Sequence, residues 1–319
     1  MKCKNITKAP NGIFVNCGTC IACRINHTSA WSLRCVYELH DWDCASFVTL
    51  TYDNEHLPDD YGLKPSDWET FKEALRYDLG LQGRKFRYLM CGEYGDDNTN
   101  SPVDPKTGSK IKHGRPHFHA ILFGLNPDPY DEKNKDRELI IQNWQKCDPL
   151  RFKWKKKDNA IDFVNREDIQ YVCGYCEKKL NGEKGKEMYG DRLPPYQKQS
   201  QGLGLNYFMQ NKDRFIELGF CYLNGKKIAI PRYFREKAGI EQNDMIKTVN
   251  KRQLQNDVKF LSDEFDKWLL QRGRTRENLH PTVYTRLFDH FYHSHAYTLS
   301  KQVEEDFLAR QKLKGRHKL

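Results

Sequence analysis

The sequence lacks any segment suited to a membrane. No apolar run reaches the length of about 18 residues that a membrane-spanning helix requires. The first residues, Met1-Lys-Cys-Lys-Asn, lack the apolar core of a signal peptide, so we do not expect export. There is no internal repeat either, and 319 residues are enough for one elaborated domain or two. Because export is not expected, the 11 cysteines favour reduced thiols over a disulfide framework.

Positive charge is abundant and clustered. The net charge is +10 and the isoelectric point is about 8.9. The segment from Arg151 to Lys157 interleaves five cations with Phe152 and Trp154, which suits phosphate contacts combined with base stacking. Residues 310–319 carry five further cations and no acid. A basic balance can simply aid solubility, but clusters of this kind favour a polyanionic partner, of which nucleic acid is the commonest.

Hydrophobic periodicity predicts an α+β fold. Strands are expected over residues 47–52, 85–93, 117–123 and 160–164, and helices from a capping box at Ser66–Glu69 and over residues 137–146 and 165–180. This order is that of a split β-α-β fold followed by an extra helix. We therefore expect an antiparallel sheet of the ferredoxin or RRM type with helices on one side. A helical C-terminal region should follow from about residue 240.

Two histidines on one strand form half of a metal site. Side chains alternate across a strand, so His117 and His119 point to the same face, while Phe118 points to the other. Glu93 ends the preceding strand, which should pair antiparallel with this one, and is the expected third ligand. Two imidazoles with a carboxylate suit Mg²⁺ or Mn²⁺. Histidines that serve only packing are the alternative for an isolated His-x-His pair.

Two tyrosines and a lysine share one face of the helix expected after Asn165. Residues four apart are neighbours on a helix, so Tyr171, Tyr175 and Lys179 should project together. A phenol with a reference pKa of about 10 needs activation before it can attack a phosphodiester. A metal that polarises the phosphate and a lysine that stabilises negative charge would both contribute. An amphipathic helix that buries two tyrosines is the alternative.

Four cysteines near the N-terminus form a second metal-ligand set. Cys17, Cys20 and Cys23 follow one another with two residues between each pair, and Cys3 precedes them. Four thiolates could hold a structural Zn²⁺, with His27 as a substitute ligand. Free thiols are the alternative, and nothing nearby suggests the redox role of an iron–sulfur cluster.

The motifs resemble a known superfamily when they are taken in order. Along the chain these are Thr49-Leu50-Thr51, then Pro116 to Phe123, then Tyr171-x-x-x-Tyr175 with Lys178 and Lys179. This set resembles the HUH endonucleases, where U is an apolar residue, and in particular their two-tyrosine rolling-circle replication initiators. The segments Cys17–Cys23, Cys91–Gly95 and Pro231–Tyr233 are similar to parts of the replication initiation proteins of gokushoviruses, which are small single-stranded DNA phages.

The resemblance implies an activity and a setting. A tyrosine would nick single-stranded DNA at the phage origin, forming a 5′-phosphotyrosine, and the second tyrosine would serve the later cut and rejoining. Tyr171 and Tyr175 carry over as nucleophiles, His117 and His119 as metal ligands, and Lys179, or less directly Lys178, as the basic partner. The implied partners are single-stranded and supercoiled origin DNA, with a host helicase and polymerase, in the cytoplasm of the bacterial host and away from membranes.

The resemblance also implies an organisation of the chain. Residues 1–40 would form a cysteine-containing segment and helix, residues 41–235 the HUH endonuclease domain, and residues 236–319 a helical region with a basic tail. A relaxase or a single-strand transposase would use the same half-sites, although relaxases usually have three histidines and transposases shorter chains. A non-catalytic nucleic-acid-binding module is the third alternative.

Overall fold

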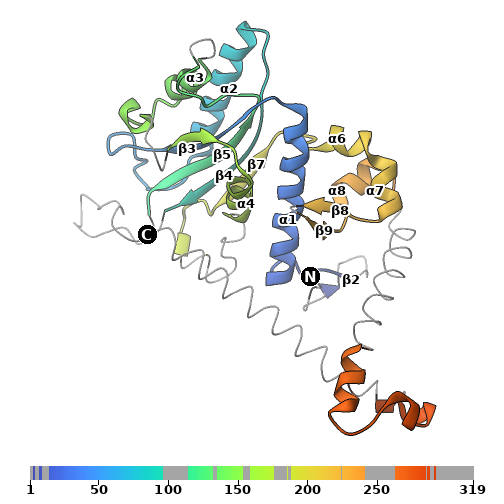
Figure 1. The fold of residues 1–319 in the computed structure, drawn as a ribbon. Coiled ribbons are helices and arrows are strands. Elements are labelled where there is room, and N and C mark those ends of the chain that lie inside the picture. The colour runs from blue at the N-terminus through green and yellow to red at the C-terminus, as the bar shows by residue number, and fades with distance from the viewer. Residues whose placement is uncertain are drawn as a thin grey trace. The chain divides into compact units, whose positions relative to one another are not determined.

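The fold is described from a computed structural model of residues 1–319 (Figure 1). The structure describes Cys3 and residues 7–8, 14–95, 114–131, 135–153, 159–175, 185, 188–223, 225–240, 263–284, 286–287 and 291. These residues fall into two compact units, Met1–Ile240 and Glu241–Leu319. Within the described ranges, no helix combines the length and the apolar content needed to cross a membrane.

The first unit contains one central sheet and two small hairpins. The strands are β1 (Thr7–Lys8), β2 (Phe14–Val15), β3 (Ala45–Thr51), β4 (Arg87–Tyr94), β5 (Pro116–Phe123), β6 (Ile161–Phe163), β7 (Tyr196–Gln199), β8 (Cys221–Leu223) and β9 (Lys226–Ile228). The helices are α1 (Ile21–Glu38), α2 (Pro65–Leu81), α3 (Asp136–Asn143), α4 (Arg166–Tyr175), α6 (Leu205–Gln210), α7 (Lys212–Leu218) and α8 (Arg232–Ala238), with 3-10 turns at Leu39–Asp41, Pro149–Phe152 and Arg276–Asn278.

The central sheet has the predicted split β-α-β topology. Its strand order is β6-β3-β5-β4-β7, and every neighbouring pair is antiparallel. The chain enters the middle of the sheet at β3, crosses through α2 to β4, returns along β5 and crosses through α3 to the edge at β6. The α+β class and the antiparallel sheet are therefore confirmed. β7 extends the sheet beyond the predicted strands because it pairs with β4.

Both faces of the sheet are covered, so the expectation of helices on one side is wrong. One face packs against α2 and α3, and its core includes Trp68, Phe71 and Phe118. The other face packs against α1 and α4, and its core includes Cys35, Ile121 and Val172 (Figure 1). The physical reason is that β4 and β5 are apolar on both sides, and an apolar sheet face must be buried against a further layer.

Two local predictions also need correction. Helix α2 begins at Pro65 with Lys64 at the N-cap and no side-chain cap, so Ser66 and Glu69 form no capping box. Proline suits the first helical position because its fixed φ is helical and its missing N–H would have had no partner there. Phe152 is 1% exposed in the core beneath α3, and this burial leaves it unable to stack on a base. Trp154, with the rest of the basic segment, lies outside the described residues.

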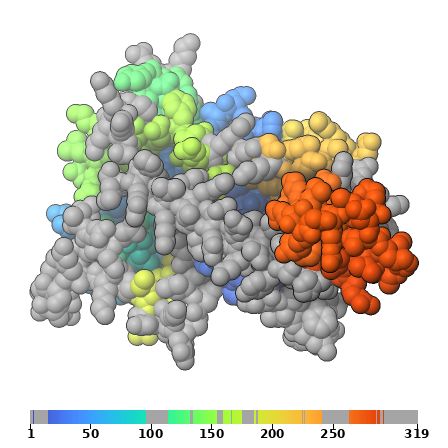
Figure 2. Space-filling model, turned by 60° about the horizontal axis from the view of Figure 1, so that its bottom comes forward, coloured from blue at the N-terminus to red at the C-terminus, as the bar shows by residue number. Residues whose placement is uncertain are grey.

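The second unit has a small aromatic core of its own. Residues 263–270 and 281–284 are helical, and Phe265, Leu269 and Phe291 are buried together. Figure 2 shows the described residues of this unit as one compact group of side chains. Of the predicted apolar stripe, Phe265 and Trp268 lie in this cluster, whereas residues 258 and 261 lie outside the described residues. The same holds for the basic tail at 310–319.

Candidate metal and nucleophile site

The sheet brings Glu93, His117 and His119 together at the end of the β4–β5 hairpin. Glu93 is the direct cross-strand partner of His117, and Thr49 on β3 is the partner of His119. All of these residues point to the sheet face covered by α1 and α4. The predicted register of Glu93 is thus observed, although the 22 residues between Tyr94 and residue 117 separate the two strands in sequence.

The three donor atoms form a small triangle. Nε2 of His117 lies 2.9 Å from Oε1 of Glu93 and 3.0 Å from Nε2 of His119. The third side, from Nε2 of His119 to Oε1 of Glu93, measures 3.2 Å. Glu93 and His119 are 6% and 5% exposed, and His117 is half-buried. The site is therefore sheltered from water but open on the side of His117.

The size of this triangle suits one divalent cation. Octahedral Mg²⁺ binds its ligands at about 2.1 Å, which places adjacent ligand atoms about 3.0 Å apart. The observed separations of 2.9, 3.0 and 3.2 Å match that spacing. Glu93, His117 and His119 could therefore hold one cation as they stand, without any change of rotamer.

Neighbouring groups fix the orientation of both imidazoles. Nδ1 of His117 lies 3.0 Å from the carbonyl oxygen of Arg115, which can only accept, so Nδ1 carries the hydrogen. Nδ1 of His119 lies 3.0 Å from Oγ1 of Thr49. This arrangement turns both Nε2 atoms toward Glu93, as expected of metal-ligating histidines whose other ring nitrogen is held by an outer partner.

The electrostatics of the triangle require positive charge at its centre. Burial acts to raise the pKa of Glu93, but hydrogen bonds from His117 and His119 outweigh it, and the pKa lies below its ordinary value. Glu93 is therefore ionised at neutral pH. A carboxylate and two Nε2 atoms in mutual contact would repel one another, so they must share either protons or a cation.

The side chain of Arg115 anchors the strand that carries the histidines. Its guanidinium donates to the carbonyl oxygens of Tyr52 and Asp53 at 3.2 and 3.0 Å, and to Oδ1 of Asn54 at 2.6 Å. These acceptors lie directly after β3. The clamp joins the start of β5 to the end of β3, and so holds the Arg115 carbonyl where His117 donates to it.

Helix α4 places Tyr171 beside the metal-ligand triangle. The ring of Tyr171 meets that of His119 edge-on, with centroids 5.2 Å apart, and meets Phe47 at 6.3 Å. Phe47 in turn stacks on His119 at 5.7 Å, with 13° between the ring planes. His119 is thus enclosed by an aromatic ring on its face and another at its edge. The structure brings together one predicted nucleophile and one predicted ligand from segments that are 52 positions apart in sequence.

Local sequence explains where α4 begins and which face it buries. Oδ1 of Asn165 accepts from the backbone N–H groups of Glu167 and Asp168 at 2.7 and 2.9 Å, and Oδ2 of Asp168 accepts from the N–H of Asn165. This reciprocal cap confirms the predicted helix start. Ile169 and Val172 are buried against the sheet. Tyr175 closes α4, but its side chain, Lys178 and Lys179 lie outside what the structure describes.

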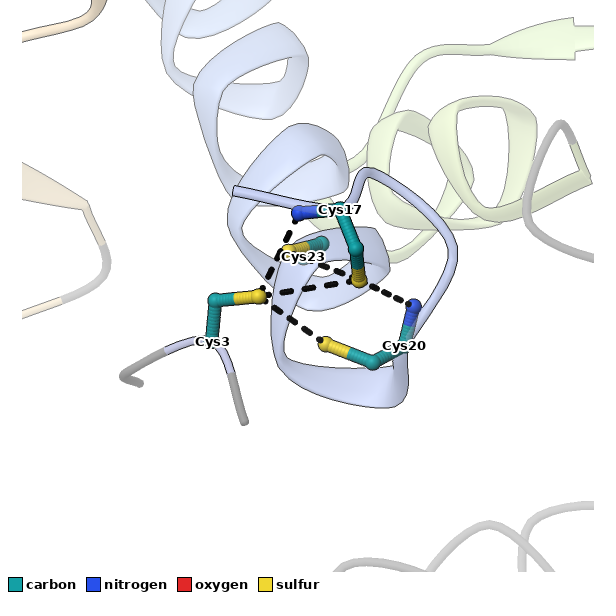
Figure 3. A group of neighbouring side chains, drawn as sticks. All are labelled: Cys3, Cys17, Cys20 and Cys23. Atoms are coloured by element: carbon teal, nitrogen blue, oxygen red, sulfur yellow. Dashed lines mark hydrogen bonds between the residues drawn. The ribbon is translucent and has the colours of Figure 1, made fainter. Parts of the chain in front are cut away.

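The four cysteines of the predicted zinc set also lie together. Their Sγ atoms all fall within 4.8 Å of one another (Figure 3). Backbone N–H groups of Cys20 and Thr19 lower the pKa of the Cys17 thiol to about 6, whereas burial raises that of Cys23 to about 12. His27 takes no part in this cluster, since its Nε2 accepts from the indole N–H of Trp31 at 3.1 Å.

Comparison with known proteins supports the relationship inferred from the motifs. Residues 45–103 match a family model for the phage replication-associated protein ORF2, a segment that contains β3, α2 and β4 with Glu93. Replication-associated protein ORF2 of Spiroplasma virus 4 is 29% identical over 244 residues, covering 72% of this chain and 69% of its own. The chain is related to phage replication-associated proteins. The resemblance to this group of proteins is confirmed.

Two further phage proteins show the same similarity. Replication-associated protein VP4 of Bdellovibrio phage phiMH2K is 28% identical over 240 residues, covering 73% of this chain and 70% of its own. Replication-associated protein ORF4 of Chlamydia phage 1 is 28% identical over 232 residues, covering 69% of this chain and 52% of its own. No solved structure matches the chain.

Sequence reasoning missed two contacts of the site in this phage-related chain. Thr49 belongs to a recognised motif but had no assigned role, and it holds His119. Arg115 precedes the His motif, and its backbone carbonyl holds His117. A threonine placed opposite a histidine on the paired strand was a usable signal once the register was known. A backbone acceptor leaves no trace in the sequence.

Proposed function

We propose that this chain initiates rolling-circle replication of a phage genome by nicking and rejoining single-stranded DNA as an HUH endonuclease. The observation that carries the proposal is the contact between Tyr171 and His119, which sets a phenol beside a buried triangle of two imidazoles and a carboxylate. The relatives are named as replication-associated proteins of phages, which supports the same role for this chain.

In this mechanism Glu93, His117 and His119 would hold Mg²⁺ or Mn²⁺. The cation would polarise a non-bridging oxygen of the scissile phosphate and orient the phosphate for attack. The carbonyl of Arg115 and the hydroxyl of Thr49 keep Nε2 of each histidine directed at the cation position. Phe47 and Tyr171 exclude water from one side of His119, which strengthens electrostatic contacts there.

The tyrosine chemistry is a transesterification. The Oη atom of Tyr171 attacks phosphorus, its proton goes to solvent or a nearby base, the bond from phosphorus to O3′ breaks, and the leaving O3′ takes up a proton. The product is a 5′-phosphotyrosine and a free 3′-OH. Because the phosphodiester energy is kept, a later attack by a 3′-OH can rejoin the strand. Tyr175 is proposed as the second nucleophile, and Lys179, with Lys178, as the cation that stabilises the developing charge.

The setting follows from this role. Single-stranded DNA and the supercoiled double-stranded origin are the proposed substrates, and a host helicase and polymerase would act on the nicked product in the cytoplasm of the bacterial cell. A relaxase or a single-strand transposase would use similar half-sites, and a purely binding role needs no nucleophile.

The deciding experiment seeks a covalent adduct. Full-length protein is incubated with single-stranded oligonucleotides tiled across the genome that encodes it, with Mn²⁺ or with EDTA, and separated under denaturing conditions. We expect an adduct at one sequence, lost with EDTA and in the double variant Tyr171→Phe/Tyr175→Phe. An adduct on any sequence, or at transposon ends or transfer origins only, favours the other enzyme classes. DNA binding with no adduct at any sequence contradicts an enzymatic role.

A further inference from the structure

We propose that Cys3, Cys17, Cys20 and Cys23 form a mononuclear structural zinc site that fixes the N-terminal hairpin to helix α1. Figure 3 shows the four sulfur atoms directed toward one another, with Cys3 approaching from the N-terminal segment and the other three from the turn into α1 and its first turn. The site is separate from the proposed nuclease site and serves a different purpose.

The sulfur spacing fits one tetrahedral cation. Zinc–thiolate bonds of about 2.3 Å place the corners of a regular tetrahedron about 3.8 Å apart. The Sγ atom of Cys3 lies 3.6 Å from that of Cys17 and 3.9 Å from that of Cys20. The Sγ atoms of Cys17 and Cys23 are 4.0 Å apart. A polynuclear iron–sulfur cluster spreads its thiolates over more than one metal atom, which this compact arrangement does not suit.

The backbone around the cluster is arranged to receive thiolates. The N–H of Cys17 donates to Sγ of Cys3 at 3.3 Å, and the N–H of Cys20 donates to Sγ of Cys17 at 3.4 Å. The hydroxyl of Thr19 also donates to Sγ of Cys17, at 3.6 Å. Such N–H donors offset part of the negative charge that four thiolates bring to one cation.

Helix α1 favours the same charge. Cys20 occupies its N-cap position, Cys23 lies in its first turn, and no acidic residue is present there. The first turn of a helix carries partial positive charge on its free N–H groups, which favours negative groups nearby. In an 18-residue helix with no side-chain cap at Cys20, thiolates would meet that need.

The hairpin needs such a link to be stable. β1 and β2 are two residues long each, and an isolated two-stranded hairpin is marginal in water. Of the N-terminal residues that the structure describes up to Cys23, Ala22 and Cys23 are the buried apolar ones. A core this small contributes little, so a metal that joins Cys3 to α1 would supply the missing stability.

The site also has a consequence for α4. Helix α1 packs along α4, and Oγ1 of Thr28, less than two turns beyond Cys23, donates to the carbonyl oxygen of Cys173 at 3.3 Å. Cys173 lies two residues after Tyr171 in the same helix. By fixing the start of α1, zinc would limit the movement of the surface on which the tyrosine helix rests.

The experiment measures metal content and thiol protection in the full-length chain. Protein purified without a metal-affinity step is analysed for zinc and iron by mass spectrometry of the elements. We expect one zinc per chain, lost in Cys20→Ser and kept in Cys44→Ser, which removes a half-buried thiol outside the cluster. The double variant His117→Ala/His119→Ala should also keep its zinc, because it alters the other metal-ligand set alone.

Two measurements on the unaltered chain keep the proposal testable if Cys20→Ser does not fold. Alkylation should spare the four cysteines until a strong chelator is added, whereas Cys44 should react equally in both conditions. Cobalt exchanged for zinc should show sulfur-to-cobalt charge transfer and the visible bands of tetrahedral coordination. Iron in place of zinc, disulfides among the four cysteines, equal alkylation without chelator, or zinc retained in Cys20→Ser would each overturn the proposal.

Discussion

His117 lies directly opposite Glu93 across the β4–β5 hairpin, with Nε2 of the histidine 2.9 Å from Oε1 of the glutamate. In the same step of the ladder the imidazole is held from behind by the carbonyl of Arg115. One cross-strand pair therefore sets both a ligand–ligand distance and a tautomer. Because the pairing sets both, the site should respond to changes in the register of the hairpin as well as to changes in its own side chains.

Glu93→Gln should weaken Mn²⁺ binding while it leaves the fold intact. The amide has the shape of the carboxylate but brings no charge to a buried cation, so we expect a loss of affinity of at least about 10-fold. Titration calorimetry or the electron paramagnetic resonance signal of free Mn²⁺ measures this. Glu73→Gln, on the exposed side of α2, is the matched control and should bind Mn²⁺ like the unaltered chain. Equal affinity in Glu93→Gln would remove Glu93 from the ligand set.

Thr49→Val should loosen the metal site through His119. The substitution keeps the branched shape and removes the oxygen that lies 3.0 Å from Nδ1 of His119. Loss of such an outer partner weakens metal binding by about 10- to 100-fold. Thr51→Val is the control, because Thr51 lies on the same face of β3 and its hydroxyl donates to the carbonyl of Tyr52. If both variants bind Mn²⁺ equally well, the contact of Thr49 with His119 has no role in orientation.

Gly114→Ala should disrupt the hairpin that aligns Glu93 with His117. A Cβ atom at Gly114 would meet the backbone of Gly95, including its carbonyl oxygen, far inside normal contact distance. The N–H of Gly114 donates to that oxygen, so the strands cannot separate without loss of the bond. We expect a loss of about 1–3 kcal/mol in the free energy of unfolding, measured in urea, together with weaker metal binding.

Gly95→Ala provides the comparison for that variant. A Cβ atom there would lie 3.7 Å from its nearest neighbour, the backbone nitrogen of Arg115, which is an ordinary contact. Its urea midpoint should stay close to that of the unaltered chain. Equal destabilisation by the two substitutions would show that the hairpin tolerates neither side chain, and that the tight contact at Gly114 is not the cause.

Tyr171→Phe should remove chemistry without removing structure. The contacts of Tyr171 with His119 and Phe47 are made by its ring, which phenylalanine retains, so the melting temperature should change by only a few degrees at most. Adduct formation should fall in this variant and vanish when Tyr175→Phe is added. Tyr77→Phe, at an exposed position of α2, should leave adduct formation unchanged. Full adduct formation in the double variant would exclude both tyrosines as nucleophiles.

The local patterns of the sequence were sufficient for the elements and for most of the site. Strict alternation along β5 placed both histidines on one face, because a strand has a period of two. The cap at Asn165 and the spacing of Ile169 and Val172 fixed the start and the buried face of α4, because helix contacts recur every three to four residues. These rules depend on neighbours in sequence, and so they can be applied without knowledge of the fold.

Tertiary structure decided what lies at long separation along the chain. The packing of α4 brought Tyr171 against His119, and the packing of α1 covered the face of the sheet that the sequence pattern had left open. The same is true of Cys3, whose sulfur reaches Cys17 across 14 positions. Periodicity states which face a side chain occupies, but the partner on that face depends on how the layers pack, and a backbone acceptor such as the carbonyl of Arg115 is chemically the same at every residue.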